Sequence, residues 1–130
     1  MHLESEKVNI AKSQKETFEF LKNAENFKKL MPKSIEKFEM LSTDSFLFQL
    51  KGMPTIKLKL EKTEPNHLVL LAATSDKLPF TLRGEIEEVN ERESSVQLIF
   101  EGEFNSMMAM MIKNPIKKFI TTLSENFKDI

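Results

Sequence analysis

Cysteine, tryptophan and tyrosine are all absent from the 130 residues of this chain. Without cysteine, the protein has no disulfide bond, no thiol nucleophile and no metal site with thiolate ligands. The only histidines, His2 and His67, are far apart in sequence, so imidazole groups alone do not assemble a zinc site. None of the glycine motifs that bind nucleotides or carry a nucleophilic serine occurs. We therefore expect no bound metal and no cofactor.

An excess of one charge sign and long apolar runs are also missing. The net charge is −1, from 19 basic and 20 acidic residues, which gives no general field for attracting nucleic acid. No stretch approaches the ~20 apolar residues of a membrane-spanning helix. Residues 1–12 are charged and contain no apolar run, so they do not resemble a signal peptide. The sequence predicts a cytoplasmic protein of one domain, residues 1–130.

Glycine is scarce, with three residues, so we expect short connections between elements. Apolar and polar residues alternate along several segments, which is typical of strands with one buried face and one solvated face. These segments are residues 37–40, 46–51, 56–61, 78–87 and 96–104. Residues 67–73 are apolar without alternation, which predicts a strand covered on both sides, and residues 6–12 predict a first strand. The connections, including 75–79, carry turn residues typical of hairpins.

Helical spacing of apolar residues appears twice. After the first strand, Ser13 is a candidate N-cap and Glu16 completes a capping box, and a break near Asn23 indicates two short helices. From residue 106 to about 128, apolar residues recur every three or four positions and predict one long amphipathic helix. We expect Met108 and Met111 to face the sheet in this helix. A kink or restart is expected at Pro115, and its ring would clash with the carbonyl of Met111 in a continuous helix.

The predicted order is one strand, two short helices, six strands and one long helix. A sheet with one apolar face must cover that face with the amphipathic helix. The sequence therefore predicts an α+β fold in which a curved antiparallel sheet of about seven strands wraps around the long C-terminal helix.

This pattern resembles the helix-grip fold of the START-like superfamily, also called SRPBCC. The superfamily includes birch-pollen allergens, polyketide cyclases and abscisic acid receptors. The features that match are "VNIAKSQKETFEFL" at 8–21, "NFKKLMP" at 26–32, the hairpin-rich middle and the C-terminal helix. The resemblance covers nearly the whole chain and rests on the order of elements, so it specifies fold better than function. It implies a cavity between sheet and helix that takes apolar or amphipathic ligands.

Residues Gly52-Met53-Pro54 are similar to the Gly-Leu-Pro gate loop of the abscisic acid receptors. The latch motif of those receptors, His-Arg-Leu, is absent, and the corresponding loop is "TSDKLPF" at 74–80. The alternative interpretation is a tight turn between two strands.

Four methionines lie within five positions, from Met107 to Met111. A methionine stripe at helical spacing is most often core, because the flexible thioether side chain fills irregular space. Methionine also suits a surface that adapts to several ligand shapes, and an exposed cluster suits an interface with a partner. All three interpretations stay open at this stage.

The apolar wall expected on the concave face favours non-enzymatic binding of a small hydrophobic molecule, such as a lipid or an isoprenoid-like compound. We assign no catalytic residue. The predicted ligand-binding residues are Phe48, Met53, Ile56, Phe80, Leu98, Phe100, Met108, Met111, Ile112 and Phe119.

Two alternatives come from other classes. The resemblance allows an enzyme of the polyketide cyclase or aromatase kind, which would need polar groups pointing inward. The candidates for these groups are His67, Arg83, Glu101 and Asn105. A protein-interaction module would instead expose Met53, Met107 and Met110 as a patch, and a homodimer would be one outcome.

Overall fold

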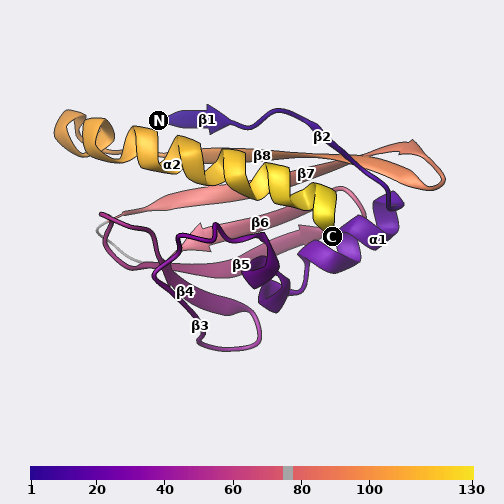
Figure 1. Ribbon diagram of the computed structural model, residues 1–130, viewed down its shortest axis with the longest axis horizontal. Helices are drawn as coiled ribbons and strands as arrows, with labels where there is room; N and C mark the ends of the chain where they lie inside the picture. The colour runs from indigo at the N-terminus through magenta and orange to yellow at the C-terminus, as the bar shows by residue number, and fades with distance from the viewer. Residues whose placement is uncertain (75–77) are drawn as a thin grey trace.

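The computed structural model describes residues 1–74 and 78–130, so the turn predicted at 75–79 lies partly outside the described residues. A curved antiparallel sheet is covered on its concave side by a long helix that runs diagonally across it (Figure 1). The strands are β1 (His2–Glu4), β2 (Val8–Ile10), β3 (Lys37–Met40), β4 (Ser45–Gln49), β5 (Ile56–Glu64), β6 (Leu68–Ala73), β7 (Phe80–Asn90) and β8 (Glu93–Gly102). The helices are α1 (Gln14–Leu21), the 3-10 helix η1 (Ala24–Leu30), α2 (Ser106–Asn126) and the 3-10 helix η2 (Phe127–Asp129).

The sheet is a meander from β3 to β8, in which each strand pairs antiparallel with the next one along the chain. The first two strands both pair with β8, where Leu3 lies opposite Phe100 and Val8 opposite Val96. The strand predicted at 6–12 is β2, and the six later strands are also confirmed. Strand β1 was missed, because a three-residue segment with one apolar side chain, Leu3, gives no alternation.

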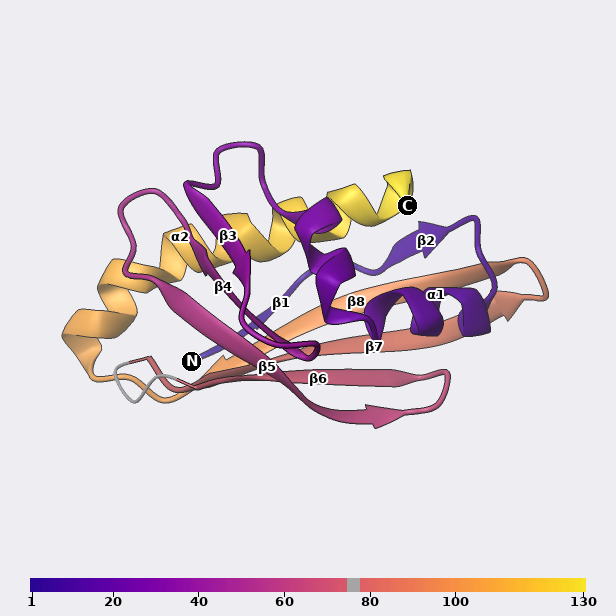
Figure 2. The same ribbon diagram turned by 90° about the horizontal axis from the view of Figure 1, so that it is seen from below.

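The first short helix begins at the predicted cap, and the break near Asn23 separates it from the second as predicted. Ser13 caps α1: its hydroxyl accepts a hydrogen bond from the backbone N–H of Glu16, and the Glu16 carboxylate accepts one from the N–H of Ser13. Asn23 then caps η1 through its side chain. These two helices lie at the end of the sheet where the β7–β8 hairpin closes, next to the C-terminal end of α2 (Figure 2).

The long helix buries a stripe of side chains against the sheet, and most of the predicted stripe is confirmed. Its buried members are Ile112, Ile116, Phe119, Ile120 and Leu123, and Phe127 follows in η2. The helix is continuous through Pro115, so the predicted restart is wrong. Pro115 has no N–H to donate to the carbonyl of Met111, so one backbone hydrogen bond is missing while the helix continues on both sides of it.

Met111 does not face the sheet as predicted. Its side chain is 65% exposed, whereas Met108 is half-buried and packs against the core. Successive helical residues point about 100° apart, so Met111 is turned well away from Ile112. The first turns of α2 also reach beyond the strands at one end of the sheet (Figure 1), where nothing in the described residues covers Met111.

Strand β6 was predicted to be covered on both faces, but only its inner face is fully buried. Val69 and Leu71 point inward and are buried, whereas Leu70 on the other face is only half-buried. Leu70 lies in register between Lys62 of β5 and Arg83 of β7. The aliphatic stems of such long side chains shield an apolar neighbour without a second layer of structure.

Candidate ligand-binding site

The concave face of the sheet is filled by phenylalanine rings. Phe48 stacks on Phe119 of α2 with 5.0 Å between ring centroids, and Phe80 lies 4.8 Å from Phe100. Further rings extend the contact, with Phe46 beside Phe48 and Phe104 beside Phe100. Such close aromatic contacts, at 4.5–7 Å, are a dense and favourable packing. The rings therefore occupy the concave space where the sequence predicted a ligand cavity.

A small void remains deeper in the core. It measures about 10 Å³, roughly the space that one water molecule needs. Its lining residues are Leu21, Phe27, Val69, Leu71, Leu82, Gly84 and Leu98. This void is far too small for an organic ligand.

A larger pocket of about 320 Å³ opens beside α2, between the helix and two loops. One loop follows η1 and the other joins β4 to β5. The lining residues are Pro32, Ser34, Leu50, Lys51, Pro115, Lys118, Phe119 and Thr122. Ligand pockets generally begin at about 300 Å³, so this pocket has the size for a small organic molecule.

The β4–β5 connection forms one wall as a tight turn. The N–H of Met53 donates to the carbonyl of Leu50 at 3.0 Å, and Gly52 has a φ of 80°. A turn of this kind needs glycine at its third position, because other residues are strained there. Met53 points into the core and is 7% exposed, while the amide of Gln49 donates to its carbonyl at 3.2 Å. The tight-turn interpretation is confirmed, and nothing in the structure tests a gating role.

The α2 wall comes from four residues on one side of the helix. Each of these residues has neighbours three or four positions away in the set, as in Pro115 with Lys118 and Phe119, and Thr122 with the same two, so they share a face. Phe119 is 5% exposed and forms the inner boundary of the pocket, because its ring stacks on Phe48 behind it. The pocket and the aromatic core therefore meet at this one ring.

Few of the predicted ligand-binding residues reach this pocket. Phe119 lines it, and Leu98 lines the small void. The residues buried in the core outside the pocket are Phe48, Met53, Ile56, Phe80, Phe100 and Ile112. The lysines and prolines of the pocket were not predicted from the sequence, because the prediction selected apolar residues that alternate with polar ones along strands. The helical spacing from Pro115 to Thr122 was the one usable sign, and the neighbouring loops were visible only in three dimensions.

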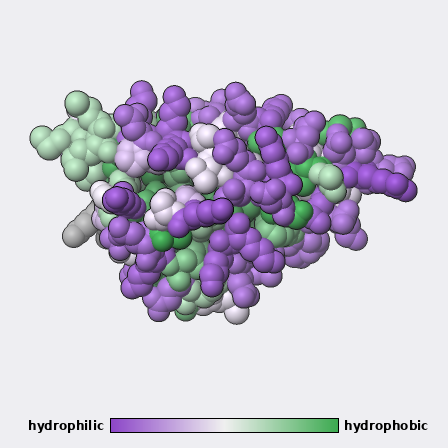
Figure 3. Space-filling model, viewed as in Figure 1, coloured by the Kyte–Doolittle hydropathy of each residue, from purple (hydrophilic) through white to green (hydrophobic). Residues whose placement is uncertain are grey.

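The methionines at the start of α2 form an exposed tip. Met107, Met110 and Met111 are 74%, 82% and 65% exposed, and we call these three residues the methionine tip. Figure 3 shows apolar surface protruding at the end of the molecule where α2 begins. Asn105 caps this end of the helix by accepting a hydrogen bond from the N–H of Met108 at 2.8 Å. The interpretation of the whole cluster as core is therefore wrong for three of its four members.

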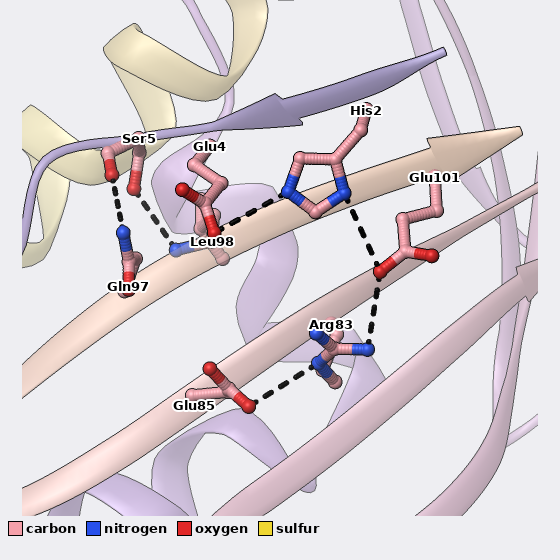
Figure 4. Close-up of polar contacts among 8 residues, drawn as sticks. All are labelled: His2, Glu4, Ser5, Arg83, Glu85, Gln97, Leu98 and Glu101. Carbon is pink, nitrogen blue, oxygen red and sulfur yellow. Dashed lines mark hydrogen bonds and ion pairs between the residues drawn. The ribbon is translucent and has the colours of Figure 1, made fainter.

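The polar residues proposed for an enzyme lie outside the pocket. Arg83 and Glu101 form an ion pair of 3.4 Å on the outer face of the sheet, with Glu85 and His2 beside them (Figure 4). His67 closes the β5–β6 hairpin and contacts Glu64 at 2.7 Å, and Asn105 serves as a helix cap. The cyclase interpretation therefore loses the four residues on which it depended.

The Glu64–His67 pair belongs to a surface turn. Hydrogen bonds from Lys62 and then from His67 hold the pKa of the Glu64 carboxyl below its ordinary value. Within residues 1–74 and 78–130, no group of three or more histidine, aspartate and glutamate side chains is placed to hold a metal ion. None of the helices in those residues is long and apolar enough to cross a membrane.

These elements define the helix-grip fold of the START-like superfamily, with an antiparallel sheet gripping a long C-terminal helix. No protein-family model matches the sequence, and no curated protein matches it either. The fold is nevertheless shared with many solved structures.

Norcoclaurine synthase from Thalictrum flavum is one of these structures, with a TM-score of 0.76 at 10% identity over 98% of this chain and 83% of that one. A START superfamily protein from Mycobacterium smegmatis has a TM-score of 0.70 at 11% identity over 98% and 94%. A conserved protein from Geobacillus kaustophilus has a TM-score of 0.67 at 11% identity over 95% and 90%. At such low identities the likeness establishes the fold alone.

Proposed function

We propose that the protein binds a small hydrophobic molecule in the pocket between α2 and the two loops. The observation that carries this proposal is the pocket of about 320 Å³, whose floor is made by Leu50, Pro115 and Phe119. Apolar lining with a few polar groups is the usual composition of a ligand site. The site lies beside the helix, next to the ring-filled space where the sequence had predicted a cavity.

The structural neighbours support this use of the fold. Norcoclaurine synthase from Thalictrum flavum, with a TM-score of 0.71 to this chain, has been solved in complex with dopamine and hydroxybenzaldehyde. Small aromatic molecules are therefore accommodated by a protein of this architecture. At 11% identity the ligand itself is not transferred to this chain.

Blocking the pocket tests the proposal. Thr122 lines the pocket and is half-buried, whereas its neighbour Thr121 is exposed outside it. We expect Thr122→Trp to weaken the binding of a neutral fluorescent hydrophobe by about tenfold or more, because the indole fills much of the space. Thr121→Trp is the matched control and should bind as the wild type does. Equal binding by all three proteins would place the site elsewhere.

Native mass spectrometry of the purified protein gives an independent reading. We expect an adduct of a few hundred daltons that organic extraction removes and that is reduced in Thr122→Trp. A wild-type protein that carries no adduct and takes up no hydrophobe would contradict ligand binding altogether.

A second candidate function rests on the methionine tip. Contiguous exposed apolar surface usually marks an interface, and this tip protrudes from the molecule (Figure 3). We propose contact with a second copy of the chain as its occupant. Light scattering of the wild type against Met107→Glu combined with Met110→Glu tests this: a dimer that becomes a monomer supports it, and a wild-type monomer at high concentration contradicts it.

The cytoplasmic location stays a prediction from the sequence. Fractionation of cells that express the tagged protein would test it, and recovery with the membrane fraction would contradict it.

A further inference from the structure

The charged residues that line the pocket, Lys51 and Lys118, are both basic. The lining comes from the segments 32–34, 50–51 and 115–122, and none of them contains an aspartate or glutamate. Their lysines are Lys33, Lys51, Lys117 and Lys118. The whole chain has a net charge of −1, so this concentration of positive charge is local. Lysines gathered at one cleft raise the local concentration of anions.

These lysines have no ion-pair partner among the residues that the structure describes. Elsewhere on the surface Lys7, Lys22, Lys37 and Lys62 each lie within 4.0 Å of a glutamate. Lys51 and Lys118 line the pocket from two different elements, the β4–β5 turn and α2. Both side chains are exposed, so their ammonium groups remain available to a ligand.

The hydroxyl groups of the pocket add to this pattern. Thr122 already donates its hydroxyl hydrogen to the carbonyl of Lys118 at 2.9 Å. Ser34 makes no side-chain hydrogen bond to the described residues, so its hydroxyl is free to donate to a ligand. With two ammonium groups and a free hydroxyl, the polar atoms of the pocket offer mainly donors.

The polar and apolar groups occupy different depths. Leu50 and Phe119 are buried and form the inner floor, while Lys51 and Lys118 are exposed at the rim. Lysine lays its aliphatic stem along apolar surface and keeps its ammonium group in water. A molecule that fits this arrangement has a hydrophobic body for the floor and an acidic group for the rim.

We propose that the ligand of this pocket is an amphipathic anion, a hydrophobic carboxylate with the size of a medium-chain fatty acid or an aromatic acid. This inference rests on the proposed function, since it assigns a chemical class to the ligand of the same pocket. The carboxylate lies between Lys51 and Lys118, and the hydrocarbon part contacts Leu50 and Phe119. Each exposed ion pair contributes about a two- to fivefold gain in affinity, so the two together give up to about tenfold or somewhat more.

The experiment compares decanoate with decanol, which share a chain and differ in charge. Titration calorimetry or displacement of a neutral fluorescent hydrophobe gives both affinities for the wild type, for Lys51→Met with Lys118→Met, and for Lys15→Met with Lys128→Met. The second pair is the matched control, because it removes the same charge from exposed positions of α1 and η2, away from the pocket walls. Methionine keeps the apolar stem of lysine, so packing changes little.

We expect the wild type to bind decanoate about five- to tenfold more tightly than decanol at low ionic strength. The Lys51 and Lys118 double variant should lose this preference while its affinity for decanol stays the same, and the control pair should keep it. The preference should also shrink as salt rises from about 0.02 to 0.5 M, because exposed charges are screened.

The possible failures are distinguishable. Equal affinity for decanoate and decanol in the wild type, or an unchanged preference in the pocket variant, overturns the anion proposal and leaves hydrophobic binding in place. Absence of binding of both molecules and of the neutral probe at about 1 mM overturns the proposed function itself, and the inference falls with it.

Discussion

Phe119 belongs both to the packed core and to the wall of the pocket for which we propose ligand binding. Its ring is 5% exposed, stacks on Phe48 at 5.0 Å and forms the inner boundary of the pocket. Truncating a buried phenylalanine removes both its hydrophobic contacts and its aromatic pairing, and it leaves a cavity in the core. The same cavity would be continuous with the pocket, so this side chain sets the depth of the pocket.

We expect Phe119→Ala to lower the free energy of unfolding by about 3–5 kcal/mol and Phe119→Leu to lower it by a smaller amount. Urea denaturation followed by far-UV circular dichroism measures both changes. Lys117→Ala, two residues away on the exposed face, is the control and should stay within about 0.5 kcal/mol of wild type. A loss of less than about 1 kcal/mol for Phe119→Ala would show that the ring is not part of the packed core.

Residue-scale patterns in the sequence predicted the core well and the pocket poorly. The alternation of strand residues correctly placed Phe48, Phe80 and Phe100 inside. The same reasoning could not show that these rings touch one another and fill the concave space. Alternation along a strand indicates which face a side chain lies on, but not how far it lies from side chains of other elements. Lys51 and Lys118 looked like ordinary solvated residues, since only the fold brings the β4–β5 turn against α2.

At the scale of elements, the start of α1 is fixed by a capping box that depends on pH. The backbone N–H of Ser13, and then its hydroxyl, hydrogen-bond the Glu16 carboxylate and hold the pKa of that carboxyl below its ordinary value. Because the pKa is lower in the folded chain than in the unfolded chain, this contribution to stability is fully present above the unfolded pKa. It is lost as the pH falls through the lowered, folded-state pKa.

Carbon NMR titration of the Glu16 carboxyl between about pH 2 and 7 tests this. We expect a midpoint below the ordinary glutamate value. In Ser13→Ala the midpoint should rise only part of the way back, because the hydroxyl is gone while the backbone N–H remains. The N-cap change should also cost about 1 kcal/mol of stability. Ser34→Ala, a serine outside the box, should leave the Glu16 midpoint where it is, and an ordinary midpoint in wild type would contradict the capping box.

The element α2 carries a proline in its interior, at a position that lines the pocket. Pro115 leaves the carbonyl of Met111 without its usual partner, and an interior proline costs a helix about 3 kcal/mol. Such a residue persists in a helix when the surrounding structure offsets the cost. Pro115 also adds ring carbon to the wall of the pocket.

We expect Pro115→Ala to raise the free energy of unfolding by about 1–2 kcal/mol, because the helix gains a hydrogen bond while the unfolded chain gains some freedom. The neutral hydrophobe should bind the variant more weakly, since the pocket loses apolar contact. Asn114→Ala, at the exposed neighbouring position, is the comparison for both measurements. A decrease in stability with Pro115→Ala would mean that packing of the proline ring outweighs the missing hydrogen bond.

At the scale of the whole molecule, the proposed ligand binding has a consequence for folding stability. A ligand that binds only the folded chain adds about 1.4 kcal/mol of stability when its free concentration is ten times its Kd. For a protein of 130 residues this corresponds to a rise in Tm of roughly 4–8 °C. The size of the shift is set by affinity and concentration and does not depend on where the ligand lies.

We therefore expect decanoate to raise the Tm of the wild type by this amount in a calorimetric scan at low salt, and to raise that of Thr122→Trp very little. Butyrate, which has the same acidic group and little hydrocarbon, controls for nonspecific effects of a carboxylate. An equal shift with both acids would show that the protein responds to charge alone.

The sequence by itself determined the elements and their order. The capping box at Ser13, the alternating strands and the apolar stripe from Ile112 to Leu123 are local patterns, and each one specifies a helix or a strand without reference to the rest of the chain. Because a one-faced sheet and one long amphipathic helix have few ways to bury their apolar faces together, these patterns also determined the helix-grip architecture.

Only the tertiary structure decided where space remains and which surfaces are left uncovered. Phe48 stacks on Phe119 and Phe80 packs on Phe100, each pair joining two different elements, and these ring contacts fill the concave side. The length of α2 relative to the sheet leaves the methionine tip in solvent, although Met111 belonged to the predicted apolar stripe. Cavities and exposed patches depend on how several distant segments fit together, and no local pattern in one segment contains that information.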